Sequence, residues 1–132
     1  MKISITKLDD YLKRTESEVQ ALRLGCEKKI VWAGESGVKS QTSIVFIHGF
    51  SASRVETYPV IDLIAAEMNA NAFFTRLRGH GKDGLALAEA TYEQLLDDTM
   101  EAIEIGKLIG DNVILIGCST GCSLIHIALC QD

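Results

Sequence analysis

The spacing of the hydrophobic residues changes along the chain and predicts the order of its elements. Apolar residues recur at helical spacing over residues 6–24, which predicts an amphipathic helix that stops at Gly25. Because the apolar stripe of this helix needs burial, we expect the helix to cover one side of a sheet. The stripe consists of Leu8, Tyr11, Leu12, Thr15, Val19 and Leu22.

From Ser43 the pattern becomes a continuous β-branched and aromatic run, SIVFIHG, which is typical of a strand buried on both faces. Strands and helices then alternate, and Thr91 with Gln94 forms a capping box at the start of the longest helix. Alternation of this kind predicts an α/β fold with a mainly parallel sheet and flanking helices. The other predicted elements are a short strand at 29–33, helices at 57–69, 91–109 and 124–130, and strands at 72–77 and 112–116.

Composition and charge narrow the class of protein. The chain has 132 residues, of which 47% are hydrophobic and 23% are charged, as in a globular domain and unlike a disordered chain. The net charge of −5 gives a nucleic-acid partner no electrostatic attraction, and no apolar run is long enough for a membrane span. The charged first ten residues lack the apolar core of a signal peptide, which predicts a cytoplasmic protein.

The cysteines and histidines do not form a metal-binding pattern. In the cytoplasm the four thiols, Cys26, Cys118, Cys122 and Cys130, are expected to be reduced. No CxxC pair occurs, and the three histidines lie far apart in the sequence. We therefore expect no metal and no organic cofactor.

Chemistry is indicated by Gly117-Cys118-Ser119-Thr120-Gly121, a G-x-S-x-G sequence between a predicted buried strand and an apolar helix. A sharp strand-to-helix turn places the central serine in strained backbone angles and leaves no room for side chains two residues away on either side. The Ser119 hydroxyl would then stand clear at the edge of the sheet. The simpler interpretation is a glycine-bounded turn with an ordinary serine.

Two more motifs follow predicted strands: His48-Gly49-Phe50 and the RGHG sequence at residues 78–81. Together with the serine turn, they resemble the α/β-hydrolase family, and most closely its serine aminopeptidase, monoacylglycerol lipase and carboxylesterase branch. The resemblance covers about residues 28–132, so we expect an N-terminal amphipathic helix over 1–27 and a hydrolase core over 28–132.

The resemblance implies a serine hydrolase that acts on small carboxylic esters or amides, with Ser119 as nucleophile. It implies an oxyanion hole made by the backbone N–H groups of Phe50 and Thr120, with Gly49 as the loop glycine. His48 is expected to support its loop rather than to transfer protons. His80 is expected to pack in a loop, with contact to substrate as the alternative.

The resemblance also implies an acid and a histidine base later in the chain than the nucleophile. After Ser119 the sequence offers only His126 and Asp132, and His126 lies too far along its helix to reach back. We therefore expect that the triad acid and base are not present in this chain, and that it is the N-terminal part of a hydrolase fold whose later strands are missing. An exposed sheet edge would favour self-association.

Two alternatives remain open from the sequence. The chain could be a non-catalytic remnant or an interaction module, because the triad acid and base are missing. Thiol catalysis by Cys118 or Cys122 is the other, although neither occupies the nucleophile position and inert thiols are expected.

Overall fold

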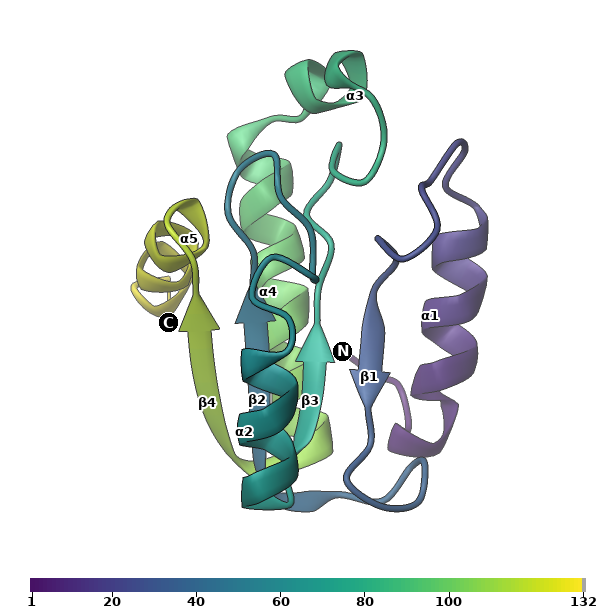
Figure 1. Ribbon diagram of the computed structural model, residues 1–132, viewed down its shortest axis with the longest axis vertical. Helices are drawn as coiled ribbons and strands as arrows, with labels where there is room; N and C mark the ends of the chain where they lie inside the picture. The colour runs from purple at the N-terminus through teal and green to yellow at the C-terminus, as the bar shows by residue number, and fades with distance from the viewer. Residues whose placement is uncertain (132) are drawn as a thin grey trace.

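The four strands form a single sheet in the order β1–β3–β2–β4, in a computed structural model that describes residues 1–131 (Figure 1). β2 runs parallel to both of its neighbours, with Phe46 opposite Phe74 and Ile47 opposite Gly117, whereas β1 is antiparallel to β3. The predicted α/β class with a mainly parallel sheet is therefore confirmed. The strands are β1 (Lys29–Val31), β2 (Ser40–Ile47), β3 (Asn71–Phe74) and β4 (Gly110–Gly117).

Helices cover both faces of the sheet: α2 lies in front of it and α4 behind it in Figure 1. Two apolar clusters fill the layers, one beneath α2 and one shared by α1, α4 and α5. The helices are a 3-10 turn at Ile5–Lys7, α1 (Leu8–Ser17), α2 (Val60–Met68), α3 (Gly84–Glu89), α4 (Tyr92–Ile109) and α5 (Thr120–Leu129).

The first helix is shorter than its hydrophobic pattern predicts, because it ends at Ser17 instead of continuing to residue 24. The Thr15 and Ser17 hydroxyls bond carbonyls of the preceding turn, at 2.9 Å and 2.7 Å, which weakens a helix end. Beyond it, the Arg23 N–H donates to the Gly81 carbonyl at 2.8 Å. A tertiary hydrogen bond thus draws this segment away from helical geometry.

The second helix begins later than predicted, at Val60, with Pro59 at its N-cap position. Thr57 does not cap it, and the Thr57 hydroxyl has no partner among residues 1–131. The apolar residues at helical spacing over 57–69 predict a stripe that faces the sheet. Of these residues, Ile61 and Ala65 are buried, whereas Tyr58, Ile64 and Met68 are exposed. The stripe facing the sheet is therefore narrower than the sequence indicates.

The longest helix follows its sequence signals closely. The Thr91 hydroxyl accepts from the Gln94 N–H, and the Gln94 side chain accepts from the Thr91 N–H, so the predicted capping box is confirmed. The short α3 was not predicted; Asp83 starts it by accepting from the Ala86 N–H at 2.9 Å.

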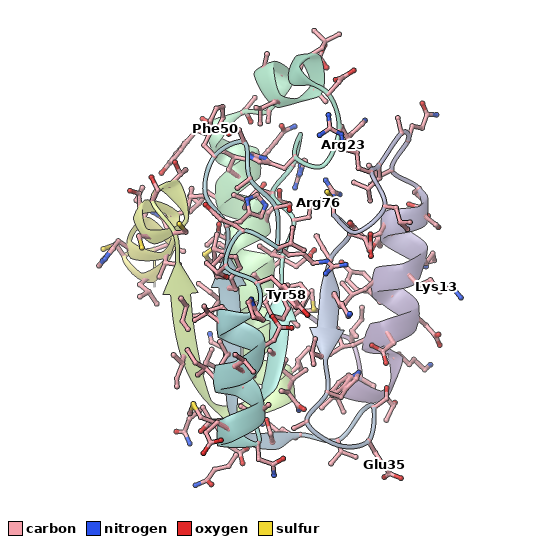
Figure 2. The ribbon with its side chains drawn as sticks, in the orientation of Figure 1. Lys13, Arg23, Glu35, Phe50, Tyr58 and Arg76 are labelled. Carbon is pink, nitrogen blue, oxygen red and sulfur yellow. The ribbon has the colours of Figure 1, made fainter. Side chains whose placement is uncertain are left out.

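α1 is part of the same packed body as the sheet. Leu8 and Leu12 are buried in a cluster with Val45 of β2, which fulfils the expectation that this helix covers the sheet. Glu16, near the end of α1, forms a bidentate ion pair with Arg76, with N···O distances of 2.8 Å and 2.9 Å. Figure 2 shows Arg76 between the sheet and α1.

Candidate functional site

Ser119 lies in the sharp turn between β4 and α5, with φ 52° and ψ −112°. Positive φ is rare for residues other than glycine and costs on the order of 1–3 kcal/mol in strained regions. The residue is exposed, and its hydroxyl has no hydrogen-bond partner within residues 1–131. The turn thus presents a free hydroxyl at the carboxyl end of the sheet, as the sequence predicts.

Both glycines of this turn are needed for steric reasons. A Cβ at Gly117 would lie 2.5 Å from the Cys122 nitrogen and 2.7 Å from the Gly121 carbonyl carbon. A Cβ at Gly121 would overlap the Ile47 carbonyl and lie 2.9 Å from the His48 carbonyl oxygen. The crowding expected on each side of Ser119 is therefore present.

The loop at residues 48–53 packs directly against the serine turn. The Cys118 N–H donates to the Ile47 carbonyl at 3.1 Å, and a Cβ at Gly49 would be 3.2 Å from the Cys118 carbonyl oxygen. Ile47 of β2 is opposite Gly117 of β4. Phe50 comes three residues after Ile47, and Thr120 comes three residues after Gly117. Their two main-chain N–H groups have no acceptor in the described part of the chain.

His48 is a buried structural residue. Its Nε2 accepts from the Leu77 N–H at 3.1 Å, and its Nδ1 donates to the Gly49 carbonyl at 2.8 Å. Burial lowers the pKa of His48 to about 4, so the ring is neutral at pH 7. Both nitrogens are occupied, which agrees with the expected role in supporting the loop and excludes this ring as a base in the structure described.

His80 has a similar environment. It is 2% exposed, its Nε2 accepts from the Ser51 N–H at 3.0 Å, and its Nδ1 lies 3.1 Å from the Arg78 carbonyl. Burial lowers its pKa as well. Loop packing is therefore the observed environment of His80, and it joins the 48–53 loop to the 78–81 turn.

Asp98 of α4 holds the 78–81 turn in place, a contact that the sequence did not predict. Its carboxylate accepts from the Arg78 N–H at 2.6 Å and from the Arg78 guanidinium at 3.1 Å. Burial raises the pKa of Asp98, although the bonds from Arg78 oppose that effect. A polar residue on the inward face of an otherwise amphipathic helix is the one signal that could have indicated it.

Glu56 holds the beginning of the 48–53 loop, at Gly49. It accepts from the Gly49 N–H at 2.8 Å, and its hydrogen bond and charge raise the pKa of the Cys118 thiol. Cys122 donates to the Gly117 carbonyl at 2.9 Å. The raised pKa of Cys118 is the opposite of what activates a thiol as a nucleophile.

No histidine in the described part of the chain hydrogen-bonds to Ser119. His126 is exposed on α5, and Asp132 lies outside the described residues. The expectation that the triad acid and base are not present in this chain stays a prediction. Residues 1–131 contain no group of three or more potential metal ligands, and none of their helices is long and apolar enough to cross a bilayer.

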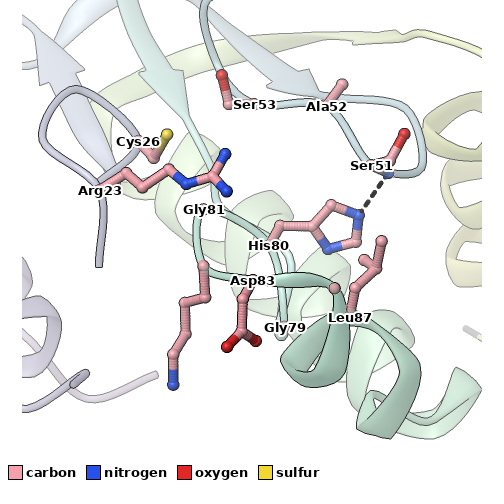
Figure 3. Close-up of a pocket in the computed structure, with 12 residues that line it drawn as sticks. Arg23, Cys26, Ser51, Ala52, Ser53, Gly79, His80, Gly81, Asp83 and Leu87 are labelled. Carbon is pink, nitrogen blue, oxygen red and sulfur yellow. Dashed lines mark hydrogen bonds between the residues drawn. The ribbon is translucent and has the colours of Figure 1, made fainter. Parts of the chain in front are cut away.

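A cavity of about 290 Å³ lies beside His80, between the 48–53 loop and the segment that follows α1 (Figure 3). The Arg23 side chain points across it toward Gly81 and His80. Sequence reasoning missed this cavity because it assigned Arg23 to a helix. Ser119 does not line it; the lining residues include Arg23, Cys26, Ser51, Ser53, His80 and Lys82.

Comparison with known proteins supports the fold. No protein-family model matches the chain, and no curated protein matches it. A solved structure from work on LipS and LipT, two metagenome-derived lipolytic enzymes, matches with a TM-score of 0.66 and 23% sequence identity. The match covers 83% of this chain but 42% of the other. The likeness shows that this chain has part of the α/β-hydrolase fold.

Proposed function

We propose that this chain carries the nucleophile and oxyanion hole of a serine hydrolase that acts on carboxylic esters, and less readily on amides. The observation that carries the proposal is the strained backbone of Ser119, with φ 52° and ψ −112° at the end of β4. A turn that only connects a strand to a helix has no need of this strain, whereas a nucleophile elbow does. The likeness to a lipolytic enzyme supports esters as the substrate class.

In the proposed reaction the Ser119 Oγ forms a bond to the ester carbonyl carbon, and the π electrons move to the carbonyl oxygen. The Phe50 and Thr120 N–H groups then donate to that oxyanion, which is the role their lack of acceptors leaves open. The serine proton passes to a base, and collapse of the intermediate expels the alkoxide, which takes up that proton. Residues 1–131 supply no base bonded to Ser119, so proton transfer in the proposed reaction falls to a histidine–carboxylate pair that these residues do not contain.

A fluorophosphonate probe tests the proposal, because an oxyanion hole that holds the phosphoryl oxygen should speed its reaction with the Ser119 hydroxyl even without the base. The Ser119 Oγ forms the O–P bond, the P–F bond breaks, fluoride leaves, and the hydroxyl proton passes to water. The unmodified chain and Ser123→Ala should be labelled, whereas Ser119→Ala should not; Ser123 is an exposed serine in the first turn of α5 and serves as the matched control.

Turnover of p-nitrophenyl acetate gives a second readout, because an oxyanion hole alone retains part of the rate enhancement. Folded protein that neither reacts with the probe nor hydrolyses the ester above the Ser119→Ala rate would contradict the proposal. That result would favour a non-catalytic interaction module.

A further inference from the structure

The 48–53 loop and the 78–81 turn meet at two imidazole rings that contact each other in a tilted arrangement. The ring centroids of His48 and His80 are 4.8 Å apart at 54°. Since the Ser51 N–H can only donate, the Nε2 of His80 must be the acceptor, and the proton of the neutral ring lies on Nδ1, where it is donated to the Arg78 carbonyl. Figure 3 shows the bond between Ser51 and His80.

The residues on the loop side of this bond are held in an unusual conformation. Ser51 has φ 63°, and the Phe50 ring meets His80 edge-on with centroids 5.7 Å apart. Only the φ and ψ angles of Phe50 separate its own N–H from the N–H of Ser51. Fixing the Ser51 N–H on His80, and the Phe50 ring against His80, therefore restricts the direction of the free Phe50 N–H.

The other side of the bond is anchored to the core. The His80 N–H donates to the Leu77 carbonyl at 3.0 Å, and Arg78 is clamped by Asp98 of α4. The Arg76 guanidinium, itself paired with Glu16, lies 3.4 Å from the His80 carbonyl. His80 therefore fixes the tip of the 48–53 loop relative to α4 and the sheet.

We propose that His80 is a positioning residue: its neutral imidazole accepts the Ser51 N–H, directs the Phe50 N–H toward the substrate oxygen, and releases the loop when it is protonated. The part that concerns substrate rests on the proposed function. Protonation would turn Nε2 into a donor that faces another donor, so the bond to Ser51 would break.

Several charges act on this ring. Burial and the Arg76 charge lower the pKa of His80, whereas the Asp98 charge and the bonds to main-chain carbonyls raise it. His48 contacts it as a second neutral ring tilted by 54°, and Arg23, Lys82 and Asp83 line the cavity on its other side. The balance lowers the pKa, so the loop is held at pH 7 and released at acidic pH.

The test that needs no enzyme activity is NMR on the ¹⁵N-labelled chain. A scalar coupling across the N–H···N bond should connect the Ser51 amide nitrogen to the Nε2 of His80 at pH 7. The bond from the Leu77 N–H to His48 is an internal reference of the same kind. On acidification the Ser51 coupling should disappear together with a shift of the Phe50 amide resonance. Absence of the Ser51 coupling at pH 7, or its loss with no change at Phe50, would overturn the proposal.

Two variants separate positioning from mere packing. His80→Gln keeps an acceptor that does not titrate, and His80→Phe keeps the flat ring without an acceptor. In the unmodified chain, the rate at which the probe labels Ser119 should fall at acidic pH. In His80→Gln that rate should stay within about twofold of the unmodified chain at pH 7 and should no longer fall at acidic pH. In His80→Phe it should be slower by about tenfold or more. His126→Gln, which replaces an exposed ring, is the control and should keep both the labelling rate and its fall at acidic pH.

The two arms also separate the proposals from each other. Should the unmodified chain fail to react with the probe, the proposed function fails, and the NMR couplings still decide whether His80 holds the loop. If the labelling rate fell as far in His80→Gln as in His80→Phe, at equal stability, the hydrogen bond from Ser51 to His80 would not control the reactivity of Ser119. The positioning role would then be wrong.

Discussion

The carbonyl group of Ile47, at the end of β2, lies directly against the Cα of Gly121, the second residue of α5. The contact joins the first helical turn after Ser119 to the strand that precedes the 48–53 loop. It leaves no space for any side chain at position 121. The two halves of the candidate site are therefore held together by main chain.

Gly121→Ala should be strongly destabilising. Its Cβ would overlap the Ile47 carbonyl, and backbone atoms on both sides leave no flexible side chain to yield. We expect a loss of about 1–3 kcal/mol in the free energy of unfolding, measured in urea. Gly84→Ala is the matched control: no atom lies within 4 Å of its added Cβ, and α3 should gain up to about 1 kcal/mol. Equal effects at both positions would contradict the argument.

Glu16→Gln should weaken the attachment of α1. Glu16 and Arg76 are both buried and bond each other twice, so removal of one charge leaves the other uncompensated. We expect a loss of about 3 kcal/mol in the free energy of unfolding. Asp111→Asn, which breaks the exposed pair with Lys39, should cost less than about 1 kcal/mol.

The same carboxylate gives a pH dependence with a definite sign. Burial would raise the pKa of Glu16, but the hydrogen bonds from Arg76 and the Lys28 N–H outweigh it and hold the pKa below its ordinary value of 4.5. The stabilisation is therefore complete above pH 4.5 and is lost as the pH falls through the folded-state pKa. Glu16→Gln should flatten the stability curve below pH 4.5; an unchanged curve would show that the pair does not lower this pKa.

His48 should also make the protein less stable on acidification, at higher pH values than Glu16 does. The unfolded ring takes up its proton near the ordinary pKa of 6.5, whereas the buried ring resists until about pH 4. The unfolded state thus binds more protons between these values, and about 3 kcal/mol is lost as the pH falls from 6.5 to 4. His80 adds to this fall, since its pKa is lowered too.

Urea unfolding at pH 7, 6 and 5 measures this slope. His48→Gln should be less stable at pH 7 but show a flatter dependence on pH. The exposed His126 supplies the control His126→Gln, which should retain the full slope. A His48 variant with the slope of the unmodified chain would mean that this ring is protonated equally in both states.

Glu56→Gln should increase the reactivity of Cys118. The Glu56 carboxylate raises the pKa of this thiol, mainly through its hydrogen bond, so its removal increases the thiolate fraction at neutral pH. Alkylation by iodoacetamide, followed by peptide mass spectrometry, should be several-fold faster at Cys118. Cys130, exposed and distant in sequence, is the internal standard whose rate should not change.

The elements whose determinants are local could be predicted from the sequence. The capping box at Thr91, the run before His48 and the crowding of Gly117 by Gly121 and Cys122 depend on neighbours within a few residues, and each structure formed as expected. α1 did not keep its predicted length, because a hydrogen bond to Gly81 from Arg23 draws the chain away.

The remaining features depend on contacts between distant positions. Glu16 and Arg76 are 60 residues apart, and Ser51 and His80 are 29 apart. No periodicity in a single sequence encodes such pairs. The roles of Phe50 and Thr120 and the expected absence of the triad acid and base came from a resemblance, and they stay predictions until they are measured.

The bond between His48 and Leu77 has a consequence for the shape of the sheet. The ladder between β2 and β3 weakens after Phe46, where the Thr75 N–H is 3.4 Å from the carbonyl, and two residues later an imidazole nitrogen receives the Leu77 N–H at 3.1 Å. A side chain thus replaces a main-chain acceptor where the two strands begin to separate. The strands can separate at this edge without leaving the Leu77 donor unpaired, so the carboxyl end of the sheet opens without the usual loss of a buried hydrogen bond.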